Sequence, residues 1–338
     1  MKRRPSDEPL IFAPRESRAL GLAASERSGI ALAALEEREY NGGEFKLRPL
    51  QSVRDRTVFV VQSLAETPEA SSALRLVRLL FLIHGLCDAG AIRVVVVIPY
   101  LAYARKDRRT KSRDPVYTRY VAQQLEAAGA DRVIALDVHN ASSIDNAFRI
   151  PVDHLSALPM MAAHFVQHLP HGRIAVVSPD IGGIKRAQLF RELLERKTAS
   201  EVELVFIEKR RDGELLSGGT IVGNPEGRAA IVLDDLCASG TTLIKAATAL
   251  RAAGATSIHA TVTHTPLEDG LAALAAADDI AQVVVTDSVG YPPKVTLPGK
   301  PGKIKILPCG ELLGCAMARM VSGESLDILA EHWPPPAA

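Results

Sequence analysis

Two acidic residues stand side by side at the end of an apolar run in the stretch IVLDDLCASGTT, residues 231–242. The residues before them are typical of a buried strand, so Asp234 and Asp235 are expected at that strand's carboxyl end. Two ionised carboxylates can accept hydrogen bonds from two neighbouring hydroxyl groups, as on a ribose, and can also orient a metal ion. A simple Asp turn would explain one acid but not the adjacent pair.

The residues that follow the two acids suit a phosphate group. Their hydroxyls, their backbone N–H groups and the start of a helix favour anion binding at Ala238, Ser239, Gly240, Thr241 and Thr242. The sequence contains no GxxxxGK[ST] motif and no GxGxxG after a strand, so it is neither a P-loop nor a dinucleotide-binding protein of the usual kind. The stretch predicts a sugar-phosphate clamp, with a plain helix cap at Ser239 or Thr241 as the alternative.

Other apolar runs also end in residues that can do chemistry. A basic loop follows in IPYLAYARKDRR, and Asp137 and His139 follow in LDVHN. Asp180 follows in VSPDIGG, and residues 209–211 follow in IEKRR. In open parallel sheets, ligands bind outside the carboxyl ends of the strands. The pattern therefore predicts sites for a small, highly charged ligand that converge at one edge of the sheets.

Each of these features also has a structural explanation. The basic loop could be a solvated or nucleic-acid-binding patch, and a lone residue such as His139 is more often structural than catalytic. The stretch IEKRRDGELLSGG, residues 207–219, predicts either a flap over the site or a charged surface hairpin. The arrangement of the elements is needed to weigh these alternatives.

Short, nearly continuous apolar runs predict strands buried on both faces. They are TVFVVQS, IRVVVVIPY, DRVIALDVHN, RIAVVSPDIGG, VELVFIEKRR, AAIVLDDLCASGTT, IHATVTHT, QVVVTDS and KIKILP. Helical stretches lie between them, at residues 69–91, 117–130, 183–196 and 242–255, and three of these end in AGA, where glycine stops the helix. This alternation predicts an α/β fold with two mostly parallel sheets flanked by helices, joined near residues 149–161.

The composition excludes several classes of protein. The 338 residues are 47% hydrophobic and 23% charged, which is a globular balance and enough for two domains. A net charge of +1 gives no general affinity for nucleic acid. The four cysteines lack zinc or CxxC spacing, and no apolar segment is long enough for a signal peptide or a membrane span. A cytoplasmic protein with no nucleic-acid or membrane partner is expected.

The motifs together resemble one family. IVLDDLCASGTT resembles the phosphoribosyl-diphosphate loop of phosphoribosyltransferases, and IPYLAYARKDRR, DRVIALDVHN, IPVDHL, VSPDIGGIKRA and IEKRR resemble, in order and spacing, the ribose-phosphate diphosphokinase branch. The resemblance covers nearly the whole chain. It implies two phosphoribosyltransferase-like domains, here 1–157 and 158–338. It also implies transfer of the diphosphoryl group of MgATP to C1 of ribose 5-phosphate, giving phosphoribosyl diphosphate and AMP.

The resemblance also implies roles for individual residues. ATP would be bound by Arg105, Lys106, Arg108 and His139, together with Tyr40 and Glu44 in REYNGGEFKL. Ribose 5-phosphate would be bound by Asp180, Asp234, Asp235, Ala238, Ser239, Gly240, Thr241 and Thr242. Mg²⁺ would be held by His139 and Asp180, and Lys209 and Arg211 would be catalytic. In the family the segment around Tyr40 reaches a neighbouring subunit's site, which implies a homo-oligomer, a dimer or a hexamer.

Three positions depart from the family pattern. Gly42 replaces an Asp in the adenine segment, Lys106 replaces a Gln, and Ala238 stands where many members have Asp. Two alternatives to the synthetase remain, and these departures keep the second of them open. One is a phosphoribosyltransferase, which would explain residues 231–242 but not the other motifs. The other is a catalytically silent regulatory homologue that binds nucleotide in a mixed oligomer.

Overall fold

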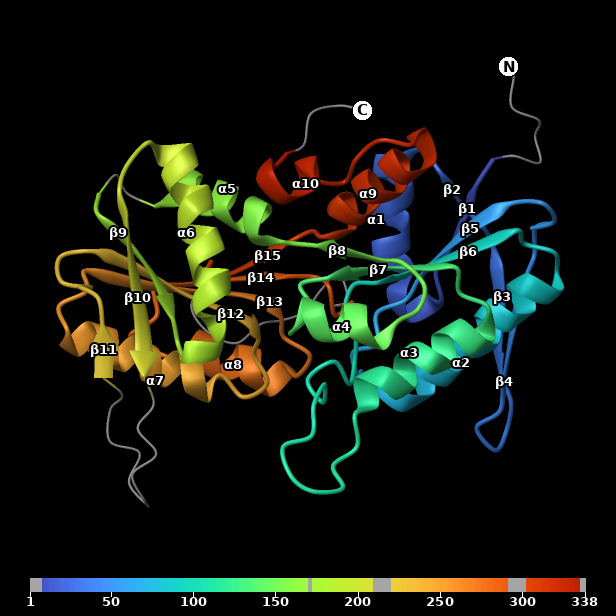
Figure 1. Cartoon of the computed structure of the whole chain (residues 1–338), viewed down its shortest axis with the longest axis horizontal. Helices are drawn as coiled ribbons and strands as arrows, with labels where there is room; N and C mark the ends of the chain where they lie inside the picture. Colours follow the sequence, from blue (N-terminus) through green and yellow to red (C-terminus); the bar gives the residue numbers. More distant parts are fainter. Residues whose placement is uncertain (1–7, 170–171, 209–219, 291–301, 335–338) are drawn as a thin grey trace.

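The computed structural model describes residues 8–169, 172–208, 220–290 and 302–334, which form two sheets, one after the other along the chain (Figure 1). All neighbouring strands of the first sheet are parallel. Its order is β2 (Ala31–Leu32), β1 (Leu10–Phe12), β5 (Thr57–Val61), β6 (Arg93–Ile98), β7 (Arg132–Leu136) and β8 (Val152–Leu155).

The second sheet is parallel in its described strands except at one edge, where β11 runs antiparallel to β10. Its order is β11 (Thr220–Val222), β10 (Val202–Glu208), β9 (Ile174–Ser178), β12 (Ala229–Leu236), β13 (Ser257–His264), β14 (Gln282–Thr286) and β15 (Ile304–Leu307). A separate antiparallel hairpin is formed by β3 (Leu35–Glu39) and β4 (Phe45–Pro49). The predicted α/β fold with two mostly parallel sheets is confirmed.

Helices bury both faces of each sheet, which explains the continuous apolar runs. In β6, Val94 and Val96 pack toward the outer helices of the first sheet, whereas Val95 and Val97 face the centre of the molecule. The outer helices of the first sheet are α2 (Ser72–Asp88), α3 (Tyr117–Ala128) and α4 (Ala141–Ala147), and those of the second are α7 (Thr241–Ala252) and α8 (Glu268–Ala276). Strands buried on both sides cannot alternate apolar and polar residues.

The central core contains side chains from both sheets and from five helices. These are α1 (Arg18–Ser28), α5 (Leu158–His168), α6 (Ile184–Thr198), α9 (Gly310–Ser322) and α10 (Ile328–Glu331). Helix α9, near the end of the chain, packs on α1, near its start. A Cβ atom at Gly314 would lie 2.6 Å from the carbonyl oxygen of Ala24, so glycine is what permits this close contact. The domain boundary at 157/158 stays a prediction.

The local signals in the sequence match the elements well. Each of the nine apolar runs contains a strand, and the four helical stretches contain α2, α3, α6 and α7. The glycine of each AGA lies in the left-handed region, with φ of 92° at Gly90, 103° at Gly129 and 84° at Gly254. Glycine adopts this conformation without a steric penalty, so the three helices stop where the sequence predicted.

Candidate active site

Twelve of the predicted site residues line a cavity between the two sheets. It has a volume of about 1380 Å³. Two of its loops follow β6 and β7 of the first sheet, and two follow β9 and β12 of the second. The predicted residues that line it are Arg105, Lys106, Arg108, His139, Asp180, Asp234, Asp235, Ala238, Ser239, Gly240, Thr241 and Thr242. The carboxyl ends of both sheets therefore open into one cavity, as parallel sheets predict.

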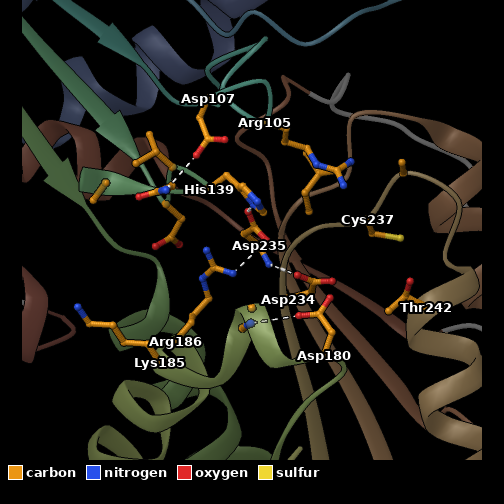
Figure 2. Close-up of a pocket in the computed structure, with 18 of the residues that line it drawn as sticks. Arg105, Asp107, His139, Asp180, Lys185, Arg186, Asp234, Asp235, Cys237 and Thr242 are labelled. Carbon is orange, nitrogen blue, oxygen red and sulfur yellow. Dashed lines mark hydrogen bonds and ion pairs between the residues drawn. The ribbon is translucent and has the colours of Figure 1, made fainter. Parts of the chain in front are cut away.

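Asp235 lies in the cavity wall and is held by two basic side chains from different elements (Figure 2). His139 Nδ1 lies 2.8 Å from Asp235 Oδ2, and Arg186 Nη1 donates to Asp235 Oδ1 at 3.0 Å. Burial alone would raise the pKa of Asp235, but the hydrogen bond from His139 and the charge of Arg186 together lower it. The hydrogen bond with Asp235 in turn raises the pKa of His139. Asp235 is thus an ionised carboxylate that joins the loop after β7 to the second sheet.

Asp234 has a different environment from its neighbour. Its Oδ1 accepts a hydrogen bond from the backbone N–H of Asp235 at 2.9 Å, and in the described part of the chain the two cations beside this strand end pair with Asp235 instead. Burial, followed by the hydrogen bond with the Asp235 side chain, raises the pKa of Asp234. The two adjacent acids are therefore not equivalent. His139 and Arg186 contact Asp235 and lower its pKa, whereas the pKa of Asp234 is raised.

The loop after β12 turns sharply into helix α7. Gly240 has φ of 75°, and a Cβ atom there would lie 3.1 Å from the carbonyl oxygen of Gly270. Helix α7 begins at Thr241, and the hydroxyls of Ser239 and Thr241 lie 3.1 Å apart. Backbone N–H groups and hydroxyls at the N-terminus of a twelve-residue helix suit a phosphate group.

Asp180 lines the same cavity after β9, the strand that pairs with β12. Its Oδ1 accepts a hydrogen bond from Gly183 N at 3.1 Å, and its carbonyl oxygen accepts one from Ser178 Oγ at 2.6 Å. A Cβ atom at Gly183 would lie 2.6 Å from that hydroxyl, so a side chain there would displace the Ser178 hydroxyl from its contact with Asp180. The tight turn fixes the Asp180 carboxylate at the edge of the cavity, directly before helix α6.

The basic loop after β6 is organised by one acid. Asp114 Oδ2 accepts hydrogen bonds from Lys106 Nζ at 2.8 Å, from Thr110 N at 3.1 Å and Thr110 Oγ1 at 2.7 Å, and from Lys111 N at 3.0 Å. These donors, Lys106 first, lower the pKa of Asp114. The extra positive charge that Lys106 brings to this position is therefore paired within the loop. Arg105 and Arg108 line the cavity beside it.

Several residues of the cavity wall were not assigned a role from the sequence. Arg186 and Lys185 come from the first turn of α6, where their spacing is that of ordinary helix surface cations. Asp107 Oδ2 accepts hydrogen bonds from Asn140 Nδ2 and Ser143 Oγ, both at 2.9 Å, and so ties the loop after β6 to the start of α4. The position of Asp107 after a predicted strand was the one feature of the sequence that could have indicated a place in the site.

Tyr40 and Glu44 lie away from this cavity. They flank the turn of the β3–β4 hairpin, which projects at the edge of the molecule beside α2, and neither lines the cavity (Figure 1). Tyr40 N donates to the carbonyl oxygen of Glu44 at 2.8 Å, and the Tyr40 side chain is exposed. Lys209 and Arg211 lie outside the described residues. Strand β10 ends before them at Glu208, and β11 begins after them at Thr220. Glu208 and Thr220 pair with each other in the antiparallel β10–β11 ladder.

The described residues hold neither a candidate membrane span nor a ready-made metal cage. None of the described helices is long and apolar enough to cross a membrane. Within the described ranges, no group of three or more His, Cys, Asp or Glu side chains is arranged to hold a metal ion by itself.

Comparison with known proteins identifies the family. Residues 10–129 match the N-terminal domain of ribose phosphate pyrophosphokinase, and residues 192–331 match the phosphoribosyl synthetase-associated domain. The chain is 35% identical to a ribose-phosphate pyrophosphokinase from Fusobacterium nucleatum over 94% of this chain and 97% of the relative, and 37% identical to one from Maricaulis maris over 85% and 88%. A crystal structure of phosphoribosylpyrophosphate synthetase from Mycobacterium smegmatis superposes with a TM-score of 0.82 at 28% identity, covering 94% of this chain and 100% of that one. The chain belongs to the ribose-phosphate pyrophosphokinase family.

Proposed function

We propose that the cavity between the two sheets is where this enzyme transfers the diphosphoryl group of MgATP to the C1 hydroxyl of ribose 5-phosphate, giving phosphoribosyl diphosphate and AMP. As a member of the ribose-phosphate pyrophosphokinase family, the chain is a transferase of diphosphoryl groups. The observation that carries the assignment to this cavity is the His139–Asp235 contact, because it joins a predicted ATP loop to the predicted ribose loop.

The two substrates are divided between the two sheets. The cations proposed for the ATP phosphates, Arg105, Lys106 and Arg108, all come from the loop after β6 of the first sheet. The residues proposed for ribose 5-phosphate lie at or just after the carboxyl ends of strands of the second sheet: Asp180 after β9, Asp234 and Asp235 at the end of β12, and residues 238–242 after it. Guanidinium groups suit phosphate oxygens, and a carboxylate with a helix N-terminus suits a sugar phosphate. The C1 hydroxyl and the β-phosphorus would then meet in the middle of the cavity.

The residues fit a magnesium ion that arrives with the nucleotide. Mg²⁺ is usually held by one or two carboxylates together with substrate phosphates and waters, rather than by a cage of protein ligands. Asp180 offers such a carboxylate, and no cage of three acidic, His or Cys ligands exists in the described ranges. Because Asp235 engages Nδ1 of His139, Nε2 is the ring nitrogen that would face the metal. The bound ion would neutralise charge on the phosphate oxygens.

Lys209 and Arg211 are proposed to act on the diphosphoryl group during transfer. They belong to the stretch between β10 and β11, the two neighbouring strands at one edge of the second sheet. Phosphoryl-type transfer needs little covalent help from a protein, so positioning and charge neutralisation are the main contributions. Cations supplied by this stretch would stabilise the negative charge that develops as AMP departs.

Tyr40 and Glu44 are proposed to complete the ATP site of a neighbouring subunit, in a homo-oligomer that works in the cytoplasm. Both residues lie on the projecting hairpin and away from the cavity of their own chain, which is the arrangement a shared site requires. A dimer is the smallest assembly in which each hairpin could serve a partner's cavity.

The proposal is tested by incubating the purified protein with MgATP and ribose 5-phosphate and measuring AMP. AMP should form only when both substrates and Mg²⁺ are present, and excess chelator should abolish it. A phosphoribosyltransferase would instead consume phosphoribosyl diphosphate in the presence of a base and make no AMP from ATP. Binding of ATP without any AMP formation would support the silent regulatory homologue.

A further inference from the structure

The two sheets are joined at the edge of the cavity, where β7 and β13 end. Thr263 Oγ1 donates a hydrogen bond to Asp137 Oδ2 at 2.7 Å, and the next residue, His264, contacts the carbonyl oxygen of Leu136 through Nε2 at 3.1 Å. Two consecutive residues at the end of β13 therefore hold two consecutive residues at the end of β7. These contacts lie two and three residues before His139.

The His264 contact has a defined direction. A carbonyl oxygen only accepts, so in the neutral ring Nε2 of His264 carries the proton that it donates to Leu136, and Nδ1 lies 2.8 Å from Ser288 Oγ. His264 is buried and packs edge-on against Tyr100, with ring centroids 5.2 Å apart. Burial lowers the pKa of His264, which favours this neutral form. The ring is thus fixed by contacts with both sheets.

Asp137 has a conformation that needs such support. Its φ is 39°, a left-handed value that a residue with a side chain rarely adopts and that persists only where the surrounding structure holds it. Besides Thr263, its carboxylate accepts hydrogen bonds from Ser156 Oγ at 2.8 Å and Ala157 N at 2.9 Å. Both oxygens of Asp137 are therefore held by the protein. The turn they maintain leads the chain from the end of β7 to His139, which faces Asp235.

We infer that Asp137 and Thr263 are positioning residues, which hold the His139 turn of the first sheet in register with Asp235 of the second. This inference rests on the proposed function, in which ATP is bound by loops of the first sheet and ribose 5-phosphate by loops of the second. Asp137 lines the cavity, but both of its carboxylate oxygens are already held by the protein, and the inferred role needs no contact with a substrate. Their contact sets how the two halves of the cavity face each other.

The proposed division of substrates predicts a specific kinetic effect. Each substrate binds mainly to loops of one sheet, so a small shift between the sheets leaves both KM values nearly unchanged. Transfer requires the C1 hydroxyl and the β-phosphorus to be aligned, and small misplacements at this step lower kcat by roughly ten- to hundredfold. A loss confined to kcat distinguishes positioning from a direct contact with either substrate.

Thr263→Val tests the inference, because valine has nearly the shape of threonine and lacks the hydroxyl. The matched control is Thr261→Val. Thr261 lies on the same face of the same strand and is equally buried, and its hydroxyl has no hydrogen-bond partner in the described part of the chain. Thr263→Ser keeps the hydroxyl and serves as the rescue variant.

The kcat of each variant is divided by the number of sites that bind a non-hydrolysable ATP analogue, so that a misfolded fraction does not count as lost catalysis. Thr263→Val should then lose roughly ten- to hundredfold in kcat with both KM values within about twofold of the parent. Thr261→Val and Thr263→Ser should resemble the parent. Deuterium uptake by the backbone of residues 137–141 should rise in Thr263→Val and not in Thr261→Val.

The inference is overturned if Thr263→Val matches Thr261→Val both in kcat per site and in deuterium uptake, or if its only effect is a raised KM for one substrate. A parent protein that makes no AMP would refute the proposed function instead. In that case the exchange experiment still decides whether Thr263 holds the His139 turn, because it needs neither substrate.

Discussion

The backbone N–H of Asp235 donates to Oδ1 of Asp234 at 2.9 Å. The two adjacent carboxylates lie at one strand end, but their pKa values are shifted in opposite directions. Asp235 is ionised beside His139 and Arg186, and its negative charge adds to burial in raising the pKa of Asp234. Ionisation of both carboxylates is unfavourable when they lie this close in a partly buried site. The difference between them gives a measurable dependence of stability on pH.

Asp234→Asn should make the protein more stable at pH 8 than the parent. The folded pKa of Asp234 is raised, so its contribution to stability is fully present below the unfolded pKa of about 4 and is lost as the pH rises through the folded value. Asparagine does not titrate and can keep the hydrogen bond from Asp235 N. The gain should be on the order of 1–3 kcal/mol at pH 8 and should fade toward pH 4.

Urea unfolding at several pH values, in buffer without metal or substrate, measures this gain. The exposed carboxylate of Asp278, changed to Asn, is the control and should give no comparable trend. A gain in Asp234→Asn that is the same at pH 4 and pH 8 would contradict the raised pKa.

Lys106→Gln should leave the use of ATP little changed. In the structure the ammonium group of Lys106 is already paired with Asp114, so this position adds little free positive charge to the cavity. The effect on KM for ATP should be less than about fivefold, as for other partly exposed ion pairs. Asp114→Ala should be more harmful, since Asp114 also accepts hydrogen bonds from Thr110 and Lys111.

Steady-state kinetics with each substrate varied in turn separate the two effects. Asp114→Ala should raise KM for ATP and leave KM for ribose 5-phosphate unchanged. If Lys106→Gln is instead the more damaging of the two substitutions, the charge of Lys106, and not the loop order that Asp114 maintains, dominates the binding of ATP.

Glu44→Ala and Lys209→Ala should complement each other when the two variants are mixed in one oligomer. Glu44 is proposed to serve a neighbour's site, whereas Lys209 serves its own, so a mixed assembly contains some sites with both residues intact. Random pairing restores roughly a quarter of the sites. Dissociation and reassociation of the mixture, followed by an AMP assay, measures the recovery. Recovery no greater than that of each variant treated alone would argue against a shared site.

Lys209→Ala should fold normally and bind both substrates with nearly the parental affinity, while kcat falls roughly 10²–10³-fold, as for loss of a donor that acts only in the transition state. Arg211→Ala should behave similarly, and the double variant should lose less than the sum of the two. The control is Arg196→Ala, which removes an exposed cation in the last turn of α6. If steady-state kinetics show that Lys209→Ala raises KM and keeps kcat, Lys209 is a binding residue rather than a catalytic one.

Most of the strands that were predicted from the sequence are buried on both faces, because a continuous run such as that of β6 is a strong local signal. The short strands β1, β2 and β11 were not predicted. The β3–β4 hairpin and β8 were not predicted as strands either. Their sequences, LEERE, FKLRP and VDHL, are charged and mostly half-buried, so neither a continuous apolar run nor a clean alternation marks them. Their strand structure depends on pairing with distant segments, which a local pattern does not reveal.

The candidate site was predictable to a similar extent. Residues at strand ends, such as Asp180 and Asp235, were found because the carboxyl ends of parallel strands meet. Arg186 was missed because it sits within an ordinary helical pattern, and its contact with Asp235 exists only once α6 packs beside β12. The Thr263–Asp137 contact joins residues 126 positions apart, on different sheets, and nothing local to either residue indicates it.

The fate of the β-phosphate of ATP tests the central claim most directly. The protein is incubated with Mg²⁺, ribose 5-phosphate and ATP that carries a radioactive label on the β-phosphorus, and the products are separated. The account predicts that the β label appears in phosphoribosyl diphosphate, while a label on the α-phosphorus appears in AMP. Recovery of the β label in ADP would show transfer of a single phosphoryl group and would contradict the account, as would recovery of all the label in unreacted ATP.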